Sequence, residues 1–392
     1  MILDKPFPPD PRVENEAISL IRSGHKVFLF CLMYSNEKEN EVIKGIEIRR
    51  YKSSNLIYKL SALVYSFPIY SLIMAKKINH FLKSNKIEII HTHDIQIAGA
   101  VLKSNKKLQL KTILDLHENR PEIMKFYPHL TKFPGKYLIS PNIWKQKEEE
   151  FINKVTNVIV VTEESKNEIV KRTSRQNEGI VVVPNTVHKN YYNTAVIQNE
   201  IIERYVNNFV LLYIGDTGLR RGLQTAIKSI SVLKNNIKNI KLVIVGSNTS
   251  DTILKNQVKD LGIQDFVDFE GWQNEKLLPS YIKASSVCIS PLHRNLHHDT
   301  TYANKIFQYM SFGIPLLVSD AISQKNIISK ANSGLIHKAE DTTDFIKKVL
   351  ELNQNVNLQM ELGENGKRFI ENEFCWEKTS EKLIELYANL SK

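Results

Sequence analysis

The chain has 392 residues, of which 42% are hydrophobic and 24% charged. This length exceeds the usual size of one hydrophobic core, so it predicts two domains, and the composition is that of a globular protein. The three cysteines, Cys31, Cys288 and Cys375, are far apart in the chain. They have neither metal-ligand nor redox spacing, which favours buried packing residues in a reducing cytoplasm.

The formal net charge of +11 is unevenly distributed. Residues 1–190 contain 30 Lys and Arg against 20 Asp and Glu, whereas the remaining residues contain 23 against 22. A basic half predicts an anionic partner, which could be nucleic acid, acidic lipid or a phosphorylated substrate. No nucleic acid is expected, because this half lacks both aromatic–basic interleaving and a helix-turn-helix pattern.

Short β-branched runs alternate with helical stretches along the whole chain. After a stub at residues 1–4, the predicted strands of the first half are 25–30, 45–49, 87–91, 112–117, 158–162 and 180–184. Those of the second half are 210–215, 242–246, 267–271, 287–290, 316–319 and 334–337. Apolar strands alternating with helices predict the α/β class, with two Rossmann-like domains of parallel sheet that face a central cleft.

The polar stretch between residues 184 and 209 predicts the boundary between these domains. We therefore expect an N-terminal domain over residues 1–190 and a C-terminal domain over residues 191–370. The last segment, 371–392, contains a predicted helix from about Trp376 to Leu390, which we expect to cross back to the N-terminal domain.

Residues 60–75 contain no charge and are flanked by lysines. The run is shorter than the roughly 20 residues of a membrane-spanning helix, and Pro68 interrupts it. We expect an interfacial helix whose flanking lysines contact an anionic membrane surface. The alternative is a core helix with solvated lysines.

Residues 300–320 (TTYANKIFQYMSFGIPLLVSD) predict a capped helix, a glycine stop and a buried strand. Thr300 or Thr301 can cap the helix, Gly313 ends it, and residues 316–318 form the strand. A helix start attracts anions, and polar side chains surround this one. An ordinary capped helix is the alternative. The neighbouring polar residues are His293, His297, His298, Asn304 and Lys305.

Four polar loops follow predicted strands, where open α/β sheets bind ligands. They are residues 91–94 (HTHD), 117–120 (HENR), 215–222 (GDTGLRRG) and the region 293–308. The 215–222 loop offers glycines for close approach and two arginines for phosphate. It is neither a Walker A loop nor a dinucleotide fingerprint. His91, His93 and Asp94 lack a second ligand cluster, so no metal site is expected.

The ordered set of motifs resembles the family 4 glycosyltransferases over nearly the whole chain. The residues that carry the resemblance are 6–17 (PFPPDPRVENEA), 90–94, 114–118, 181–185, 213–223, 242–246, 269–272 and 304–315. The resemblance implies a GT-B fold, with a nucleotide-sugar donor in the C-terminal domain and an acceptor in the N-terminal domain. It also implies retention at the anomeric carbon, without a metal or other cofactor.

The resemblance assigns roles to individual positions. Arg221 falls where the family has a basic residue on the donor diphosphate, and His117 falls at a histidine near the transferred sugar. Gln308 and Thr300 occupy the positions of the two glutamates of the family's E-x7-E motif, so both glutamates are missing. Gln308 can still hydrogen-bond ribose hydroxyls. Asp216 stands where many members have a second diphosphate-binding arginine, which Arg220 can replace.

We therefore expect a retaining glycosyltransferase that adds a sugar to a lipid-linked surface glycan, such as O-antigen, capsule or exopolysaccharide, at the cytoplasmic membrane face. The expected catalytic residues are His117, Glu118 and Arg221. The expected donor-binding residues are Gly215, Arg220, Arg221, Gly222, His293, Thr300, Thr301, Asn304, Lys305 and Gln308. The expected acceptor residues are Asp10, Arg12, His93 and Asp94. The alternatives are a nucleotide-sugar 2-epimerase of the same fold and a non-catalytic partner of another transferase.

Overall fold

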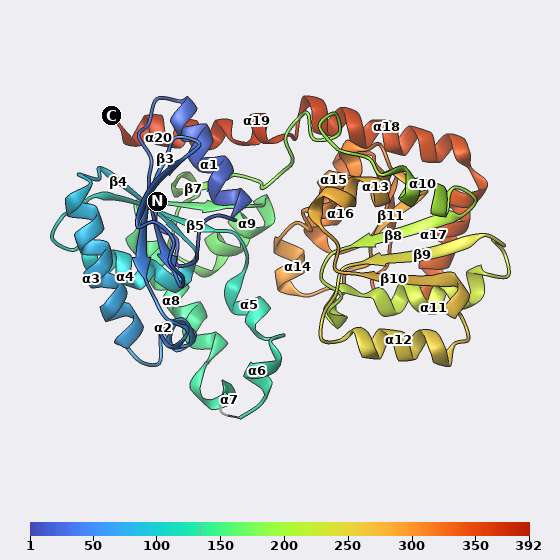
Figure 1. The fold of residues 1–392 in the computed structure, drawn as a ribbon, viewed down its shortest axis with the longest axis horizontal. Coiled ribbons are helices and arrows are strands. Elements are labelled where there is room, and N and C mark those ends of the chain that lie inside the picture. The colour runs from blue at the N-terminus through green and yellow to red at the C-terminus, as the bar shows by residue number, and fades with distance from the viewer. Residues whose placement is uncertain (134) are drawn as a thin grey trace. The chain divides into compact units, whose positions relative to one another are not determined.

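The structure is a computed structural model that describes residues 1–133 and 135–392. These residues form two compact units (Figure 1). The N-terminal unit comprises Met1–Asn185 and Thr379–Lys392, and the C-terminal unit comprises Thr186–Lys378. The chain therefore passes from the first unit to the second between Asn185 and Thr186.

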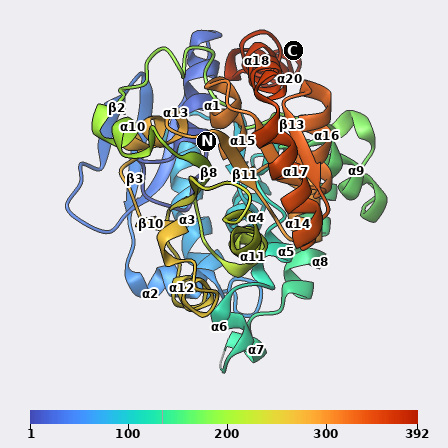
Figure 2. The same cartoon turned by 90° about the vertical axis from the view of Figure 1, so that its right-hand side faces the viewer.

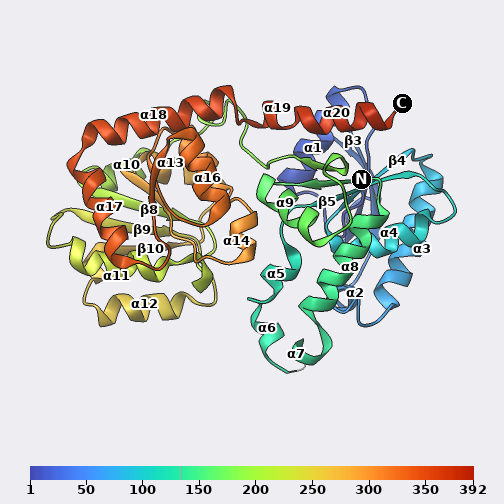
Figure 3. The same cartoon turned by 180° about the vertical axis from the view of Figure 1, so that it is seen from behind.

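The N-terminal unit contains both parallel and antiparallel strand pairs. Its strands are β1 (Phe28–Met33), β2 (Asn40–Ile43), β3 (Ile46–Lys52), β4 (Ile89–His93), β5 (Lys111–Leu116), β6 (Asn157–Val160) and β7 (Ile180–Val182). Its helices are α1 (Pro11–Arg22), α2 (Asn55–Ser61), α3 (Ile69–Ser84), α4 (Ile95–Asn105), α5 (Arg120–Met124), α6 (Pro128–Thr131), α7 (Gly135–Leu138), α8 (Pro141–Lys154), α9 (Glu163–Arg172) and α20 (Glu381–Leu390). Figure 3 shows α5 to α8 from behind.

Two sheets make up this unit, and the N-terminal stub joins them. Strands β4, β5, β6 and β7 are parallel neighbours in that order, and β3 lies between β1 and β2. Ile2 forms parallel bridges to both Phe30 and Thr92, so the predicted stub links the sheets. Strand β2 was not predicted and pairs antiparallel with β3. Its sequence, Asn-Glu-Val-Ile, is short and exposed, so it lacks the apolar run that marks a buried strand.

The two faces of the β4–β7 sheet differ in chemistry because side chains alternate along a strand. Ile90, Leu114 and Val158 belong to the hydrophobic core that also contains buried residues of α3, α4 and α8. The intervening positions of β4 and β5 carry buried polar side chains, including His91 and Asp115. The fold thus places a polar layer on one face of a sheet whose other face is the apolar core.

The C-terminal unit has one parallel sheet in the order β10-β9-β8-β11-β12-β13. Its strands are β8 (Phe209–Ile214), β9 (Ile240–Val245), β10 (Val267–Gly271), β11 (Val287–Ser290), β12 (Leu316–Ser319) and β13 (Gly334–His337). Its helices are α10 (Asn199–Tyr205), α11 (Leu223–Leu233), α12 (Asp251–Asp260), α13 (Leu278–Lys283), α14 (Leu296–Thr300), α15 (Lys305–Ser311), α16 (Ile322–Ala331), α17 (Thr342–Gln354) and α18 (Val356–Asn372), and α19 (Trp376–Thr379) ends at the unit boundary.

Helices cover both faces of this sheet, as the alternation of apolar strands and helices predicts. Leu212 and Val243 pack in a core shared with α15 and α16, whereas Leu211 and Leu242 pack in a second core shared with α11 and α17. Helices α11 and α17 lie side by side (Figure 2). The C-terminal unit is therefore a doubly covered parallel sheet of the Rossmann-like type.

The uncharged run of residues 60–75 is not one helix, so that part of the prediction is wrong. Helix α2 ends at Ser61, and α3 begins after Pro68, because a proline starts a helix more readily than it continues one. Tyr70 and Met74 are buried in the core, whereas Phe67, Ile69 and Leu72 are about half exposed. Among the described residues, no helix combines the length and the apolar character needed to cross a membrane.

The helix predicted after Thr300 begins later than expected. Asn295 caps a separate short helix, α14, by accepting a hydrogen bond from the His298 N–H at 2.9 Å. Thr300 is the last residue of α14, and α15 begins at Lys305. The prediction that residues 300–303 are a helix start is therefore wrong. Gly313, with φ of 69°, and β12 lie where the sequence placed the stop and the strand.

The predicted helix at residues 376–390 is divided into α19 and α20. Helix α20 follows the C-terminal unit in sequence but packs within the N-terminal unit, beside α1 and β7. All three cysteines are free and buried, as their apolar surroundings predict.

Candidate active site

Each unit contains a cluster of polar residues near the ends of parallel strands, buried in the N-terminal unit and mostly half-buried in the C-terminal unit. The cluster in the N-terminal unit, which we call the histidine cluster, comprises Glu16, His91, His93, Asp115 and His117. The cluster in the C-terminal unit, which we call the arginine cluster, comprises Asp216, Arg220, Arg221, His298 and Lys305.

The histidine cluster forms because strand periodicity and register bring its members together. His93 and Asp115 are register partners on β4 and β5. One oxygen, Asp115 Oδ2, lies 3.4 Å from His91 Nε2, 3.3 Å from His93 Nδ1 and 3.2 Å from His117 Nε2. The imidazole rings of His91, His93 and His117 are stacked in succession. Asp115 thus holds three histidines around one buried carboxylate.

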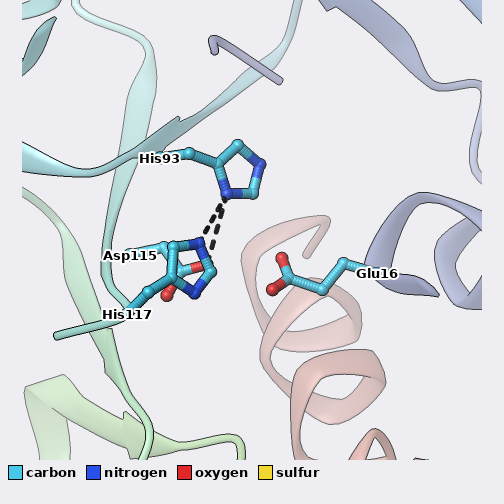
Figure 4. A group of neighbouring side chains, drawn as sticks. All are labelled: Glu16, His93, Asp115 and His117. Carbon is cyan, nitrogen blue, oxygen red and sulfur yellow. Dashed lines mark hydrogen bonds and ion pairs between the residues drawn. The ribbon is translucent and has the colours of Figure 1, made fainter. Parts of the chain in front are cut away.

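Two helices close the polar face over this cluster. Glu16 on α1 directs its carboxyl group toward His117 and Asp115 (Figure 4), and its Oε2 lies 3.5 Å from His91 Nε2. The Tyr387 hydroxyl on α20 lies 3.0 Å from His91 Nδ1. These contacts exclude water from His91 and Asp115, which are both fully buried.

Burial and charge set the protonation of the cluster. Burial lowers the pKa of His117 to about 4, so its imidazole is neutral at pH 7. Burial, and then the charge of Asp115, hold the pKa of Glu16 well above its usual range, which favours its neutral form. Burial raises the pKa of Asp115, but His117, His91 and His93 outweigh it and keep the carboxyl ionised. Asp115 is therefore the one anion at the centre of the cluster.

Four of these groups also have the chemistry of metal ligands. Glu16, His93, Asp115 and His117 each offer a ligand atom, and these atoms lie within 4.8 Å of one another. Two imidazoles and two carboxyls suit Zn²⁺. However, the positive charge of Arg12 acts on both Asp115 and His117, and it would repel a second cation placed beside them. We therefore interpret the cluster as a network of shared protons.

The other residues predicted to bind the acceptor lie around the histidine cluster. Asp10 caps α1 through the Val13 N–H and forms an ion pair with Arg12 at 3.3 Å. Asp94 has a φ of 67°, a strained conformation that is frequent at functional sites. It pairs with Lys5 at 3.4 Å. Near them, Glu118 pairs with Arg120 at 2.8 Å.

Three members of the arginine cluster, Asp216, Arg220 and Arg221, lie in the segment that follows β8. Asp216 Oδ2 accepts hydrogen bonds from Arg220 at 3.0 Å and from Arg221 at 3.3 Å. Burial raises the pKa of Asp216, but the Asn248 hydrogen bond and the Arg221 charge outweigh it and lower the pKa. Asp216, at the position of a missing arginine, therefore orients the two arginines that remain.

Backbone packing holds this loop against the neighbouring strand end. Gly222 has φ of 76°, and a Cβ placed there would lie 1.8 Å from the Pro291 carbonyl oxygen. Gly215 has φ of 121°, and its carbonyl oxygen would lie 2.0 Å from a Cβ at Gly246. Glycine is thus required at Gly222 and Gly246, and the His293 N–H donates to the Arg220 carbonyl at 3.1 Å.

A half-buried lysine lies beside the arginines. Lys305 lies over the ring of Tyr213, with Nζ 3.3 Å from the ring centroid. Burial, and then the charge of Arg221, hold the pKa of Lys305 well below its usual range. Arg220 also contacts His298 Nε2 at 3.0 Å. An anion bound here would raise the pKa of Lys305 and favour its charged form, so the cluster is chemically suited to phosphate.

The remaining predicted donor residues lie on α14 and α15. Thr300 and Thr301 are buried, and their hydroxyls donate to backbone carbonyls of α14. Asn304 is exposed at the N-cap of α15, and Gln308 is half-buried one turn later. The His293 side chain lies 3.9 Å from Glu340.

Several members of the two clusters were not predicted. Asp115 and Glu16 were missed, although alternation in Leu114-Asp115-Leu116-His117 places Asp115 and His117 on one face. Glu16 falls at no periodic polar position near a strand end, so the local sequence gives no signal for it. The role of Asp216 could have been found from its four-residue spacing to Arg220.

Four buried histidines make stability depend on pH. Burial lowers the pKa of His91 and His298 to about 3, of His117 to about 4 and of His297 to about 2. Below pH 6.5 the histidines of the unfolded chain bind protons, whereas those of the folded chain do not. The free energy of unfolding therefore decreases as the pH is lowered. From pH 7 to pH 5 we expect a loss of about 2 kcal/mol for each histidine.

Thermal unfolding between pH 7 and pH 5 measures this loss. His297→Gln should reduce the pH dependence, because one buried histidine is removed. The matched control is His80→Gln, since His80 is exposed on α3. Equal pH dependence in the wild-type protein and the His297→Gln variant would contradict the prediction.

Two family models match the chain and together span most of it. The model "Glycosyltransferase Family 4" matches residues 12–191, and "Glycosyl transferases group 1" matches residues 197–369. An uncharacterized glycosyltransferase of Methanocaldococcus jannaschii is 25% identical over 390 residues, covering 97% of this chain and 93% of the relative. A capsular polysaccharide biosynthesis glycosyltransferase of Staphylococcus aureus is 21% identical over 246 residues, covering 60% and 62%.

Solved structures share the fold over nearly the full length. Sucrose-phosphate synthase from Thermosynechococcus elongatus superposes with a TM-score of 0.79 at 15% identity, covering 97% of this chain and 93% of that one. Anabaena HepE in complex with UDP superposes with a TM-score of 0.74 at 12% identity, covering 99% of both chains. The chain therefore belongs to the family 4 glycosyltransferases and has the GT-B fold.

Proposed function

We propose that the protein is a retaining glycosyltransferase that moves a sugar from a nucleotide-sugar to a lipid-linked surface glycan. The arginine cluster carries this proposal, because Arg220 and Arg221, both paired with Asp216 and with Lys305 nearby, form a site for a diphosphate. Relatives support it, since one acts in capsular polysaccharide biosynthesis and a structural neighbour holds UDP. We assign the donor to the C-terminal unit and the acceptor to the N-terminal unit.

The proposed reaction needs positioning and charge stabilisation from the protein. The acceptor oxygen bonds to the anomeric carbon from the face that the diphosphate leaves. The bond from that carbon to the diphosphate oxygen breaks with its electron pair, and the acceptor proton passes to the departing diphosphate. Arg221 and Arg220 stabilise the charge that develops there, and Lys305 adds to it. Gln308 binds the ribose, and His293, Thr301 and Asn304 border the donor.

The N-terminal unit supplies the acceptor side of this proposal. Neutral His117, held by Asp115, and Glu118 orient the acceptor hydroxyl and the transferred sugar. Asp10, Arg12, His93 and Asp94 surround them. The basic charge of this unit supports the proposed position of the enzyme at the cytoplasmic face of the membrane. No metal or other cofactor takes part, because arginines replace the cation that would neutralise the diphosphate.

Donor binding and transfer test the proposal in one series. Saturation-transfer NMR against UDP-, GDP-, dTDP- and CMP-sugars identifies the nucleotide, and transfer to a synthetic lipid-linked sugar follows. We expect one class of nucleotide-sugar to bind. The product should have the same anomeric configuration as the donor, and turnover should be unchanged in EDTA. Inversion would contradict retention, and loss of turnover in EDTA would contradict the metal-free reaction. Epimer formed from donor alone would favour the 2-epimerase.

A further inference from the structure

A pocket of about 680 Å³ lies within the N-terminal unit, and of its lining residues only Arg120, in the 117–120 loop, belongs to the polar loops predicted from the sequence. Helices α2, α4, α5 and α8 contribute to its lining, together with the segment that follows the N-terminal bridge. Six of its lining side chains decide what it can bind. They are the aromatic residues Tyr58, Tyr127 and Trp144 and the cationic residues Lys5, Lys59 and Arg120.

The aromatic side chains give the pocket a fixed apolar wall. Trp144 is 3% exposed and is held edge-on by Tyr65 at a ring separation of 4.8 Å. The guanidinium of Arg120 lies over the Tyr127 ring at 5.6 Å. Tyr58 is 57% exposed and stands at the mouth. Aromatic walls of this kind bind an apolar chain or the apolar face of a sugar ring.

The cations surround this wall and favour an anionic ligand. Lys5 and Arg120 each already have one carboxylate partner, Asp94 at 3.4 Å and Glu118 at 2.8 Å. The pocket also contains Asp4, and burial raises the pKa of Asp4 to about 6. Three cationic side chains and one carboxyl group therefore line the pocket, and the guanidinium of Arg120 can bind phosphate through two N–H groups.

The same ion pairs connect the pocket to the histidine cluster. Asp94 directly follows His93, and Glu118 directly follows His117, so a ligand that contacts Lys5 and Arg120 lies beside the proposed acceptor residues. On the other side, exposed apolar residues continue from the pocket lining along α7 and α8. They are Tyr137, Leu138 and Ile143, which are 77%, 37% and 39% exposed.

We propose that this pocket binds the lipid diphosphate that carries the acceptor sugar. Building on the proposed function, the inference adds the chemical class of the acceptor. Lys5, Lys59 and Arg120 bind the diphosphate, and the first apolar units of the lipid pack on Tyr58 and Trp144. The sugar extends toward His117 and Asp94, and the remaining lipid follows Tyr137, Leu138 and Ile143.

Calorimetric titration of the full chain tests this inference with four probes. They are farnesyl diphosphate, farnesol, inorganic diphosphate and vesicles of phosphatidylglycerol. We expect farnesyl diphosphate to bind at least about tenfold more tightly than farnesol or inorganic diphosphate, because only farnesyl diphosphate contacts both the aromatic wall and the cationic side chains. Lys59→Ala and Tyr58→Ser should each weaken this binding about tenfold. Both side chains are exposed, so these variants keep the fold.

The control variant is Lys107→Ala, which removes an exposed lysine of the same unit outside the pocket. Its affinity for farnesyl diphosphate should equal that of the wild-type protein. Equal binding of inorganic diphosphate would instead indicate a soluble phosphorylated ligand. Binding to vesicles without a preference for farnesyl diphosphate would indicate contact with phospholipid headgroups. Either outcome would overturn the inference.

Donor binding separates failure of this inference from failure of the proposed function. In the same variants, nucleotide-sugar binding by NMR should be unchanged, since Tyr58 and Lys59 belong to the N-terminal unit. If Lys59→Ala and Tyr58→Ser keep both donor binding and the wild-type affinity for farnesyl diphosphate, only the inference about the pocket is rejected. Loss of donor binding in the wild-type protein would reject the transferase proposal itself.

Discussion

Arg221→Ala should reduce kcat by about 100- to 1,000-fold, the range typical of removing one group that stabilises transition-state charge. Arg221 Nε lies 3.3 Å from Asp216 Oδ2, and Lys305 is near it, so the guanidinium lies at the proposed diphosphate site. The fold should persist, because Arg220 still pairs with Asp216 at 3.0 Å. Turnover of the donor sugar, measured with saturating acceptor, checks this prediction.

The matched control is Arg204→Ala in the same unit. Arg204 forms an exposed ion pair with Glu270 at 3.0 Å, and such pairs contribute little to stability. Its turnover should remain within about twofold of the wild-type value. Arg221→Lys keeps the charge but loses the planar fork, so it should have intermediate turnover. Near-wild-type turnover in Arg221→Ala would remove Arg221 from the mechanism.

Gly222→Ala should destabilise the C-terminal unit by about 4 kcal/mol or more, through backbone strain and a steric clash. The φ of 76° alone accounts for about 1–2 kcal/mol. The added Cβ would also lie 1.8 Å from the Pro291 carbonyl oxygen, which is backbone and cannot rotate away. Displacing this segment would also shift the His293–Arg220 hydrogen bond, so turnover should fall as well.

Gly262→Ala is the control for backbone strain alone. Gly262 has φ of 60°, but no atom lies within 4 Å of a Cβ placed there. Its cost should therefore be about 1–2 kcal/mol, with unchanged turnover. Thermal unfolding of both variants separates the two effects. Equal unfolding temperatures for Gly222→Ala and Gly262→Ala would show that the close approach to Pro291 does not constrain the loop.

The sheets could be predicted from sequence because their signal is local. Runs such as residues 210–215 and 242–246 are continuously apolar, which marks strands covered on both faces. Strand β2 was missed because an exposed strand pairs through its backbone and needs no apolar run. The start of α15 was misplaced because threonine is a common helix cap, which made Thr300 look like the first residue before a helix. In the structure Thr300 instead ends the short helix α14, which Asn295 caps.

The site was only partly predictable, since its members are distant in sequence. The arginines of the 215–222 loop were found because they are adjacent, and the histidines because they follow strands. The partnership of Asp115 with His91, His93 and His117 depends on strand register, which a single sequence does not specify. The pocket of Tyr58 and Trp144 brings together side chains from many segments, so no local pattern marks it.

The position of α20 has a consequence for the order in which the protein is made. The Tyr387 hydroxyl contacts His91, and α20 packs on α1 and β7, so a helix that is synthesised after the whole C-terminal unit belongs to the first unit. Domains generally fold as units while the ribosome is still adding residues. Here the C-terminal unit can finish folding before α20 is made, whereas the N-terminal unit stays open until residues 381–390 emerge. A chain terminated before Glu381 would therefore leave the histidine cluster exposed to water, because α20 covers it.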